Sequence, residues 1–290
     1  MKSFERQYLK LMRKILKVGT IKDTRNSKTK SVFGEVIKIA KEDGVPLLQT
    51  RRIYYSGVLG EVAAFMTGPK NVKDFVDKGC NYWKLWSDKK NGNLRLSYGN
   101  EWINWGASAN NPTGINQFLE VVELAKANKY DRRMIVTGWN PQAVKYGKLS
   151  LPCCHHTYQW NINTVDGVDY LDMSYSMRSN DVAIGLPSNM FMAYIMNVLM
   201  KNMLCQNGVD VRLGDITIFI GDAHLYEDHW VMAKKQSSIL NELKYLMVDD
   251  SIKISYNYGF DMSDMFNFNP KHILIENYEP KTVIKYKLYK

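Results

Sequence analysis

The chain has 290 residues, 45% of them hydrophobic and 12% aromatic, enough for the core of one large domain or two modest ones. No apolar run is long enough to span a bilayer, and the four cysteines have neither a zinc-site spacing nor the number that a disulfide framework needs. The net charge of +10 is spread along the chain, which favours a solvated lysine-rich surface over a nucleic-acid groove. A basic site for phosphorylated small molecules is the intermediate interpretation.

The cysteine content and the lack of a secretory signal favour a reducing cytoplasm. The abundance of Lys, Asn and Tyr is typical of an AT-rich genome and favours a viral source, a bacteriophage being one candidate. In that case the protein would act in the host cytoplasm.

The first half of the chain mixes helical and strand patterns. Residues 1–19 are expected to form a basic, amphipathic N-terminal helix that ends near Gly19, followed by a polar, mobile loop at Lys22–Lys30. The other elements expected here are a strand at Val32–Ala40, a buried helix at Tyr54–Met66, an amphipathic helix at Gln117–Ala127 and a strand at Met134–Thr137.

The second half begins with a hairpin pattern, two strands at His156–Ile162 and Val168–Tyr175 around the turn Asp166-Gly167. An apolar helix at Asn189–Met203, a buried strand at Val211–Ile220, a helix at Leu225–Lys235 and a basic tail at residues 280–290 are expected to follow. Strands and helices do not alternate regularly, so the sequence predicts a single α+β domain over residues 1–290.

The segment Leu151–Gln159 offers a nucleophile where a loop enters a strand, because it reads Leu-Pro-Cys-Cys-His-His-Thr-Tyr-Gln. A thiol reacts as its thiolate, and the later cluster at 178–181, Arg-Ser-Asn-Asp, could lower a thiol pKa or hold an anion. A Cys-His pair on its own favours a structural cysteine. The catalytic interpretation therefore depends on the other polar clusters of the chain.

Three such clusters interrupt apolar surroundings: Asp131-Arg132-Arg133, Gly185-Leu186-Pro187-Ser188-Asn189 and Gly221-Asp222-Ala223-His224-Leu225-Tyr226. Paired arginines are usually surface charge, yet they also suit a phosphate. An asparagine at a helix start is usually a cap, although its amide could instead read a base edge because it both donates and accepts.

Taken in order, these clusters resemble thymidylate synthase and its relatives, the pyrimidine nucleotide hydroxymethylases. Cys154 matches the nucleophile of the family's Pro-Cys-His-x-x-x-Gln, with Cys153 in the position before it. The other matches are Arg178–Asn189 with Arg-Ser-x-Asp and Gly-Leu-Pro-x-Asn, Arg132–Val136 with Arg-Arg-x-x-Val, Gly221–Tyr226 with Gly-Asp-x-His-x-Tyr, and Glu61 within Gly-Glu-Val-Ala-Ala-Phe-Met-x-Gly. The resemblance runs from about Asp23 to Lys285. It implies a symmetric homodimer, packed sheet to sheet, in which helices flank a large twisted mixed sheet.

The resemblance also implies the chemistry. The Cys154 thiolate would add to C6 of a pyrimidine nucleotide, and C5 would then attack the methylene of the cosubstrate 5,10-methylenetetrahydrofolate. Glu61 would manage protons near ring O4, and the neutral amide of Asn189 would pair with uracil, which favours dUMP. The catalytic residues implied are Cys154, Glu61, Arg178, Asn189, Tyr98 and His155.

For the nucleotide, the resemblance implies that Arg178 and Ser179 hold the phosphate, with Arg132 and Arg133 reaching it from the partner subunit. The substrate-binding residues implied are Arg25, Arg132, Arg133, Gln159, Ser179, Asn180, Asp181, His224 and Tyr226, of which the last two would bond the sugar 3′-hydroxyl. The family's loop arginine directly follows Asp; here Thr24 follows Asp23, so Arg25 is shifted by one position.

For the folate, the resemblance implies Arg51, Tyr82, Trp83, Trp86, Asp181, Ile184, Gly185 and Ser188, with both tryptophans stacking on the pterin. Without the resemblance, both tryptophans would be assigned to the core. No metal and no membrane contact are expected.

Departures from the family pattern distinguish two activities. Ser188 stands where the synthases have Phe, which removes a wall against the aryl ring of the folate, and the tail lacks their apolar end. Both changes favour water as the final nucleophile, which gives a dUMP hydroxymethylase and 5-hydroxymethyl-dUMP. The alternatives are a thymidylate synthase that gives dTMP and dihydrofolate, and, in a different class, a non-catalytic nucleic-acid-binding protein.

Overall fold

The computed structural model describes residues 1–108, 110–241, 252–256, 264–280 and 284–288. The helices are α1 Ser3–Val18, α2 Tyr55–Phe65, α3 Val72–Val76, α4 Tyr98–Ile103, α5 Gln117–Ala127, α6 Pro141–Lys145, α7 Gly185–Gln206 and α8 Trp230–Ser238. The strands are β1 Thr20–Asp23, β2 Lys28–Ile39, β3 Ile135–Thr137, β4 His155–Val165, β5 Val168–Asp181, β6 Arg212–Tyr226, β7 Lys253–Tyr256 and β8 Ile273–Glu276. Short 3-10 turns lie at Lys41–Asp43, Tyr82–Leu85, Glu227–His229, Ile239–Asn241 and Pro270–His272.

A mixed six-stranded sheet in the order β1-β2-β6-β5-β4-β3 forms the centre of the molecule. Only β5 and β6 are parallel; the other neighbouring strands of this sheet are antiparallel. The parallel pair requires a long crossover, which α7 supplies. Strands β7 and β8 form a separate antiparallel pair.

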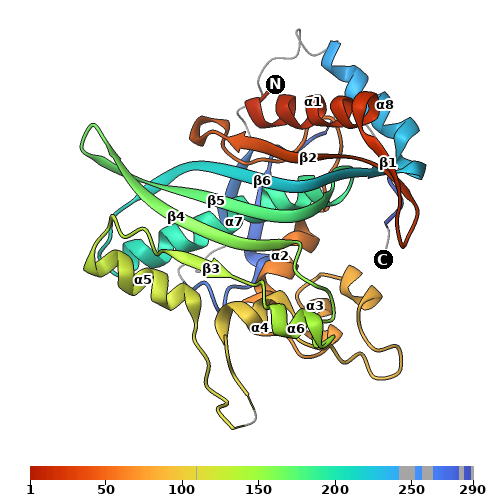
Figure 1. Cartoon of the computed structure of the whole chain (residues 1–290). Coiled ribbons are helices and arrows are strands. Elements are labelled where there is room, and N and C mark those ends of the chain that lie inside the picture. Colours follow the sequence, from red (N-terminus) through yellow and green to blue (C-terminus); the bar gives the residue numbers. More distant parts are fainter. Residues whose placement is uncertain (109, 242–251, 257–263, 281–283, 289–290) are drawn as a thin grey trace.

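The apolar face of the sheet packs against helices. Tyr158 of β4, Tyr175 of β5 and Ile218 of β6 pair across neighbouring strands and are fully buried. Helix α7 lies along this face and contacts β5, β6 and α2 (Figure 1). Helices α1 and α8 lie side by side next to β1 and β2 at one edge of the sheet, whereas α3, α4 and α6 gather near β3 at the other edge. The described chain thus forms the α+β fold that its sequence predicts.

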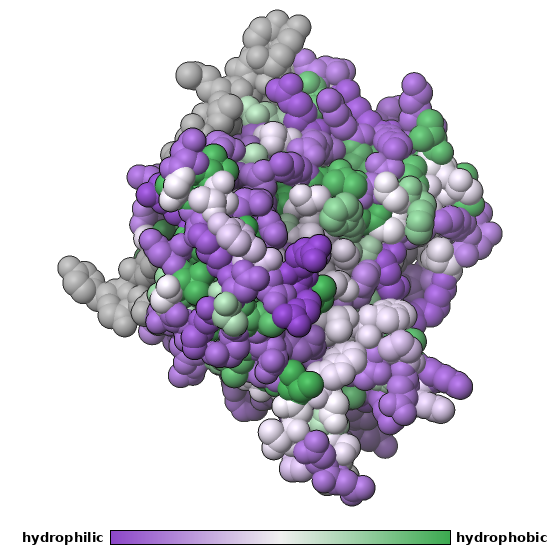
Figure 2. Space-filling view, turned by 60° about the vertical axis from the view of Figure 1, so that its left-hand side comes forward, coloured by the Kyte–Doolittle hydropathy of each residue, from purple (hydrophilic) through white to green (hydrophobic). Residues whose placement is uncertain are grey.

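The other face of the sheet carries exposed apolar side chains. Val36 on β2 and Phe219 on β6 pair with each other and are 52% and 46% exposed. They alternate with the buried pair Ile37 and Ile218, as the two-residue period of a strand requires. Elsewhere, apolar side chains lie in small patches among polar ones (Figure 2). No helix within the described residues is both long and apolar enough to cross a bilayer.

Several sequence-based elements are confirmed. The first helix ends at Val18, α5 covers Gln117–Ala127 as expected, and β4 and β5 form the predicted hairpin. Its turn places Asp166 and Gly167 at φ values of 51° and 76°, the left-handed conformation that an Asp-Gly turn provides.

Three expectations are wrong. The segment Lys22–Lys30 is mostly a β1–β2 hairpin, because its residues pair from Thr20 with Ser31 to Asp23 with Lys28. The helix expected from Leu225 begins only at Trp230, since Leu225 still pairs with Lys30 in β6. Asn189 is no helix cap, because α7 begins four residues earlier, at Gly185.

Candidate functional site

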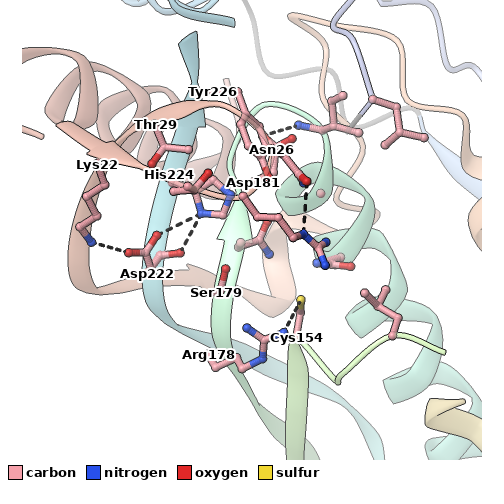
Figure 3. A pocket seen from close by; sticks show the side chains of 18 of the residues that line it. Lys22, Asn26, Thr29, Cys154, Arg178, Ser179, Asp181, Asp222, His224 and Tyr226 are labelled. Atoms are coloured by element: carbon pink, nitrogen blue, oxygen red, sulfur yellow. Dashed lines mark hydrogen bonds and ion pairs between the residues drawn. The ribbon is translucent and has the colours of Figure 1, made fainter. Parts of the chain in front are cut away.

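A pocket of about 520 Å³ opens where β5, β6 and the start of α7 meet (Figure 3). It collects residues that are far apart in the sequence. The predicted site residues that line it are Arg25, Trp86, Cys154, Arg178, Ser179, Asn180, Asp181, Ile184, Gly185, Asn189, His224 and Tyr226. Seven other lining residues are not among the predicted ligands: Lys22, Thr24, Asn26, Thr29, Leu151, Asp222 and Leu288.

The sheet register assembles this pocket. Because β5 and β6 are parallel and in register, Ser179 pairs with Asp222 and Asp181 with His224. Gly221 permits the close approach of these strands, since a Cβ at that position would lie 2.5 Å from the carbonyl oxygen of Arg178. The two polar motifs therefore end at the same edge of the sheet.

Cys154 immediately precedes β4, where the backbone N–H of Arg178 donates to its carbonyl at 2.8 Å. The Arg178 guanidinium donates from Nη2 to the Cys154 sulfur at 3.6 Å. It also donates to the carbonyls of Cys153 and Pro152, at 2.8 and 3.1 Å. The loop that carries Cys154 thus holds the Arg178 guanidinium in place against the thiol.

Burial raises the pKa of the Cys154 thiol, and the charge of Arg178 opposes that shift. The neighbouring Cys153 is fully buried and its sulfur donates to the carbonyl of Gly138 at 3.1 Å. Burial raises the Cys153 pKa much further. Of the two adjacent thiols, only Cys154 lines the pocket, as the sequence predicts.

Glu61 is a partly buried carboxylate in the otherwise apolar helix α2. The hydroxyl of Tyr82 and the indole N–H of Trp83 each donate to it at 2.6 Å. Burial raises its pKa from 4.5 to about 7, against the lowering effect of these two hydrogen bonds. A carboxyl group with this pKa can both take up and release a proton near neutral pH.

An aromatic layer connects Glu61 with the nucleophile. Trp83 is buried, stacks on Phe75 at a centroid distance of 4.6 Å, and lies 5.9 Å from the ring of Tyr98. The hydroxyl of Tyr98 accepts a 3.4 Å hydrogen bond from the backbone N–H of Cys154. Trp83 and Tyr82 are therefore packed within the fold as partners of Glu61, and Trp86 is the tryptophan that lines the pocket.

His155, which the sequence places among the catalytic residues, points into the aromatic core. It is 4% exposed, bonds the hydroxyl of Tyr158 at 2.5 Å and stacks on Tyr175. Burial lowers its pKa to about 3, so it is neutral at physiological pH. In this position it supports the start of β4 and does not contact the pocket.

Two predicted folate ligands lie beside the pocket. The Nη2 group of Arg51 donates to the carbonyl of Ala183 at 2.7 Å, and its guanidinium lies 5.3 Å from the ring of Tyr286. The hydroxyl of Ser188 donates back to the carbonyl of Ile184 at 3.3 Å, within the first turn of α7.

Three predicted ligands lie away from this pocket within a single chain. Arg132 and Gln159 line a separate depression on the outer face of the sheet, where Gln159 donates to the Arg132 carbonyl at 3.1 Å. Arg133 is exposed and binds Asp131 through Nε at 3.0 Å and Nη2 at 2.5 Å. This pair lowers the pKa of Asp131 to about 2.

Among the residues that the structure describes, no group of three or more His, Cys, Asp or Glu side chains could hold a metal ion. The pocket instead combines a thiol, several cations and hydrogen-bonding side chains. That set suits an anionic organic ligand.

The pKa of Glu61 generates a stability prediction. In the unfolded chain this carboxyl ionises near pH 4.5, whereas in the folded protein it stays neutral up to about pH 7. Wild-type stability should therefore fall by about 3 kcal/mol between these pH values and stay level above them. The Glu61→Gln variant has no carboxyl group to titrate at this position. Its stability relative to wild type should therefore rise between pH 4.5 and about pH 7. Denaturant unfolding at pH 4.5, 7 and 8.5 measures the difference; parallel pH profiles of the two proteins would contradict the prediction.

The family model described as thymidylate synthase matches residues 6–289 of the chain. This match covers nearly the whole sequence, including every residue that lines the pocket.

Proposed function

The chain belongs to the thymidylate synthase family, and from this premise we propose that it is a dUMP hydroxymethylase. Membership of the family implies a one-carbon transferase that acts on C5 of dUMP with methylenetetrahydrofolate as cosubstrate. The finer assignment, with water as the final nucleophile and 5-hydroxymethyl-dUMP as the product, is the proposal.

In the proposed mechanism, Cys154 forms a bond from its sulfur to C6 of the uracil ring. The electrons of the C5–C6 double bond move toward O4. C5 then bonds the methylene carbon of the folate, whose bond to N10 breaks as that nitrogen takes up a proton. Arg178 stabilises the thiolate before attack, and Glu61, with a pKa of about 7, exchanges the protons of these steps. Asn189 lines the pocket on the second turn of α7, where its amide can pair with the base.

Loss of the C5 proton and cleavage of the bond from the methylene carbon to N5 then release tetrahydrofolate. Both activities share the resulting intermediate, which carries an exocyclic methylene on C5. Hydride from tetrahydrofolate reduces this group to a methyl in a synthase. Addition of water to it, followed by release of Cys154, gives the hydroxymethyl product and leaves tetrahydrofolate unoxidised. A tenfold preference between these outcomes needs only about 1.4 kcal/mol between their barriers.

Ser188 is the observation that carries the choice of water. Its small side chain turns back onto α7 by bonding the Ile184 carbonyl, and it puts no aromatic wall beside Asn189. The tail supports the same choice, because Lys287 is exposed and pairs with Asp228 at 3.2 Å while only Leu288 among the described tail residues lines the pocket. A pocket with this tail and without an aromatic wall at position 188 admits ordered water.

The proposal predicts the products directly. Wild-type protein incubated with dUMP and methylenetetrahydrofolate should yield a nucleotide with the mass of 5-hydroxymethyl-dUMP and no dihydrofolate absorbance. Ser188→Phe should shift the product ratio toward dTMP by about tenfold, because the ring excludes water from the intermediate. Ser188→Ala is the matched control and should keep the wild-type ratio. Stoichiometric dTMP and dihydrofolate from the wild type would identify a synthase instead.

The adjacent cysteines allow a clean test of the nucleophile. Cys154→Ser should lower turnover of dUMP by at least about 10³-fold, because a serine hydroxyl lacks the nucleophilicity of a thiolate. Cys153→Ser should keep turnover within about tenfold of wild type, with its main cost in stability because Cys153 is buried. Incubation with 5-fluoro-dUMP and the folate should trap an adduct on Cys154, which mass spectrometry can locate. An adduct on Cys153 would refute the assignment.

We further propose a homodimer in which Arg132 and Arg133 bind the phosphate in the partner's pocket. The exposed apolar side chains of the outer sheet face, among them Val36 and Phe219, support this packing. Exposed Arg133 and the distance of Arg132 from its own pocket are consistent with a role in a second chain.

Subunit mixing tests this arrangement. Cys154→Ser and Arg133→Ala homodimers should each have little activity. Random mixtures should recover up to about a quarter of wild-type activity, since half the dimers are mixed and one of their two sites is intact. Mixtures that recover none, despite mixed dimers seen by native mass spectrometry, would place Arg133 outside the partner's site.

A further inference from the structure

We propose that Lys22 and Asp222 are positioning residues that fix the tautomer of His224 and thereby make it a hydrogen-bond acceptor for the sugar hydroxyl. The inference rests on the proposed function and adds to it a source of sugar specificity. Lys22, Asp222 and His224 form a chain of contacts along one wall of the pocket (Figure 3).

The geometry of Asp222 determines which nitrogen of His224 carries the proton. Its Oδ1 lies 3.1 Å from Nδ1 of His224, and its backbone carbonyl lies 3.4 Å from the same nitrogen. Both neighbours of Nδ1 are acceptors, so Nδ1 must be the donor. The neutral ring then has an unprotonated Nε2, which can accept a hydrogen bond from a ligand hydroxyl.

Lys22 completes the arrangement from a strand distant in the sequence. Its ammonium donates to Oδ2 of Asp222 at 2.7 Å, which leaves Oδ1 for the histidine. The hairpin makes this contact possible, because Lys22 pairs with Thr29, and Thr29 in turn pairs with Tyr226 of β6. The bonds to His224 and Lys22 lower the pKa of Asp222 to about 2, so the carboxylate stays ionised.

The ammonium has a second effect on the pocket. An isolated Asp222 carboxylate would repel an anionic nucleotide and would favour a protonated imidazole, which has no acceptor nitrogen. Pairing with Lys22 cancels most of that charge. The three residues together direct Nε2 of the imidazole toward the pocket as an acceptor beside Tyr226, and the His224 and Tyr226 rings are in edge contact at 5.3 Å. This surface recognises a sugar that donates a hydroxyl proton.

The test compares dUMP with 2′,3′-dideoxyUMP, which lacks the 3′-hydroxyl. Wild-type protein should prefer dUMP in kcat/KM by about 10- to 100-fold, and Asp222→Asn should reduce this preference to about threefold or less, because its amide can face Nδ1 with a donor. Lys22→Met should lower the preference by a smaller factor, about three- to tenfold. Glu35→Gln breaks a similar exposed pair, Lys14–Glu35 at 2.6 Å, and should keep the wild-type preference.

A second readout does not depend on turnover. Nitrogen-15 NMR of His224, assigned by comparison with His224→Gln, should report protonated Nδ1 and unprotonated Nε2 in wild type and a shift toward protonated Nε2 in Asp222→Asn. A wild-type Nε2–H tautomer, or an Asp222→Asn variant that loses activity on both nucleotides by the same factor, would overturn the proposal. Absence of any product from dUMP would instead refute the proposed function and leave the NMR result intact.

Discussion

The parallel pairing of β5 with β6 is the constraint on which the site depends. It sets the ends of two distant motifs against each other, so that Asp181 faces His224 across a backbone ladder. The backbone N–H of Arg178 then bonds the carbonyl of Cys154 and adds the nucleophile to the same edge. Main-chain hydrogen bonds therefore fix the relative positions of the Cys154 thiol, the Arg178 cation and His224. Side-chain substitutions can change the chemistry of this site while its frame persists.

Charge balance in the pocket supports the proposal that a second chain contributes to binding of the proposed substrate. Arg178 is close to the Cys154 sulfur, so a phosphate that approaches it competes with the thiolate for the same guanidinium. Lys22 is paired with Asp222, and Asp181 contributes a further negative charge to the wall. Arg25 is the other arginine of the described lining, and these two do not balance a dianion, a thiolate and Asp181 together. Cations from a second subunit would restore that balance.

The sequence predicts the family, the α+β class and the core of the pocket, because each of these depends on local patterns. Residues 178–181 and 221–226 are motifs that the sequence reveals directly, and the structure places them at the ends of β5 and β6. Local patterns give wrong predictions where pairing between distant segments determines the secondary structure. Leu225 has helical neighbours, yet it stays in β6 because Lys30 completes its ladder. Lys22 was assigned to a mobile loop, since nothing near it in sequence reveals an Asp222 partner 200 residues away. The sequence predicts the same role for Trp83 and Trp86. Only their packing shows that Trp83 belongs to the core and that Trp86 lines the pocket.

The proposed determinants of substrate and product lie on consecutive residues of α7. Asn189 lines the pocket and directly follows Ser188 on α7, and His224 and Tyr226 of β6 line the pocket as well. In the proposed complex, recognition of the base, recognition of the sugar and exclusion of water would thus use separate side chains on rigid elements. A change in the final nucleophile then requires no change in how the nucleotide binds. Because the two product-forming barriers need to differ by only about 1.4 kcal/mol for a tenfold preference, the proposed mechanism would allow a single residue at position 188 to redirect the reaction.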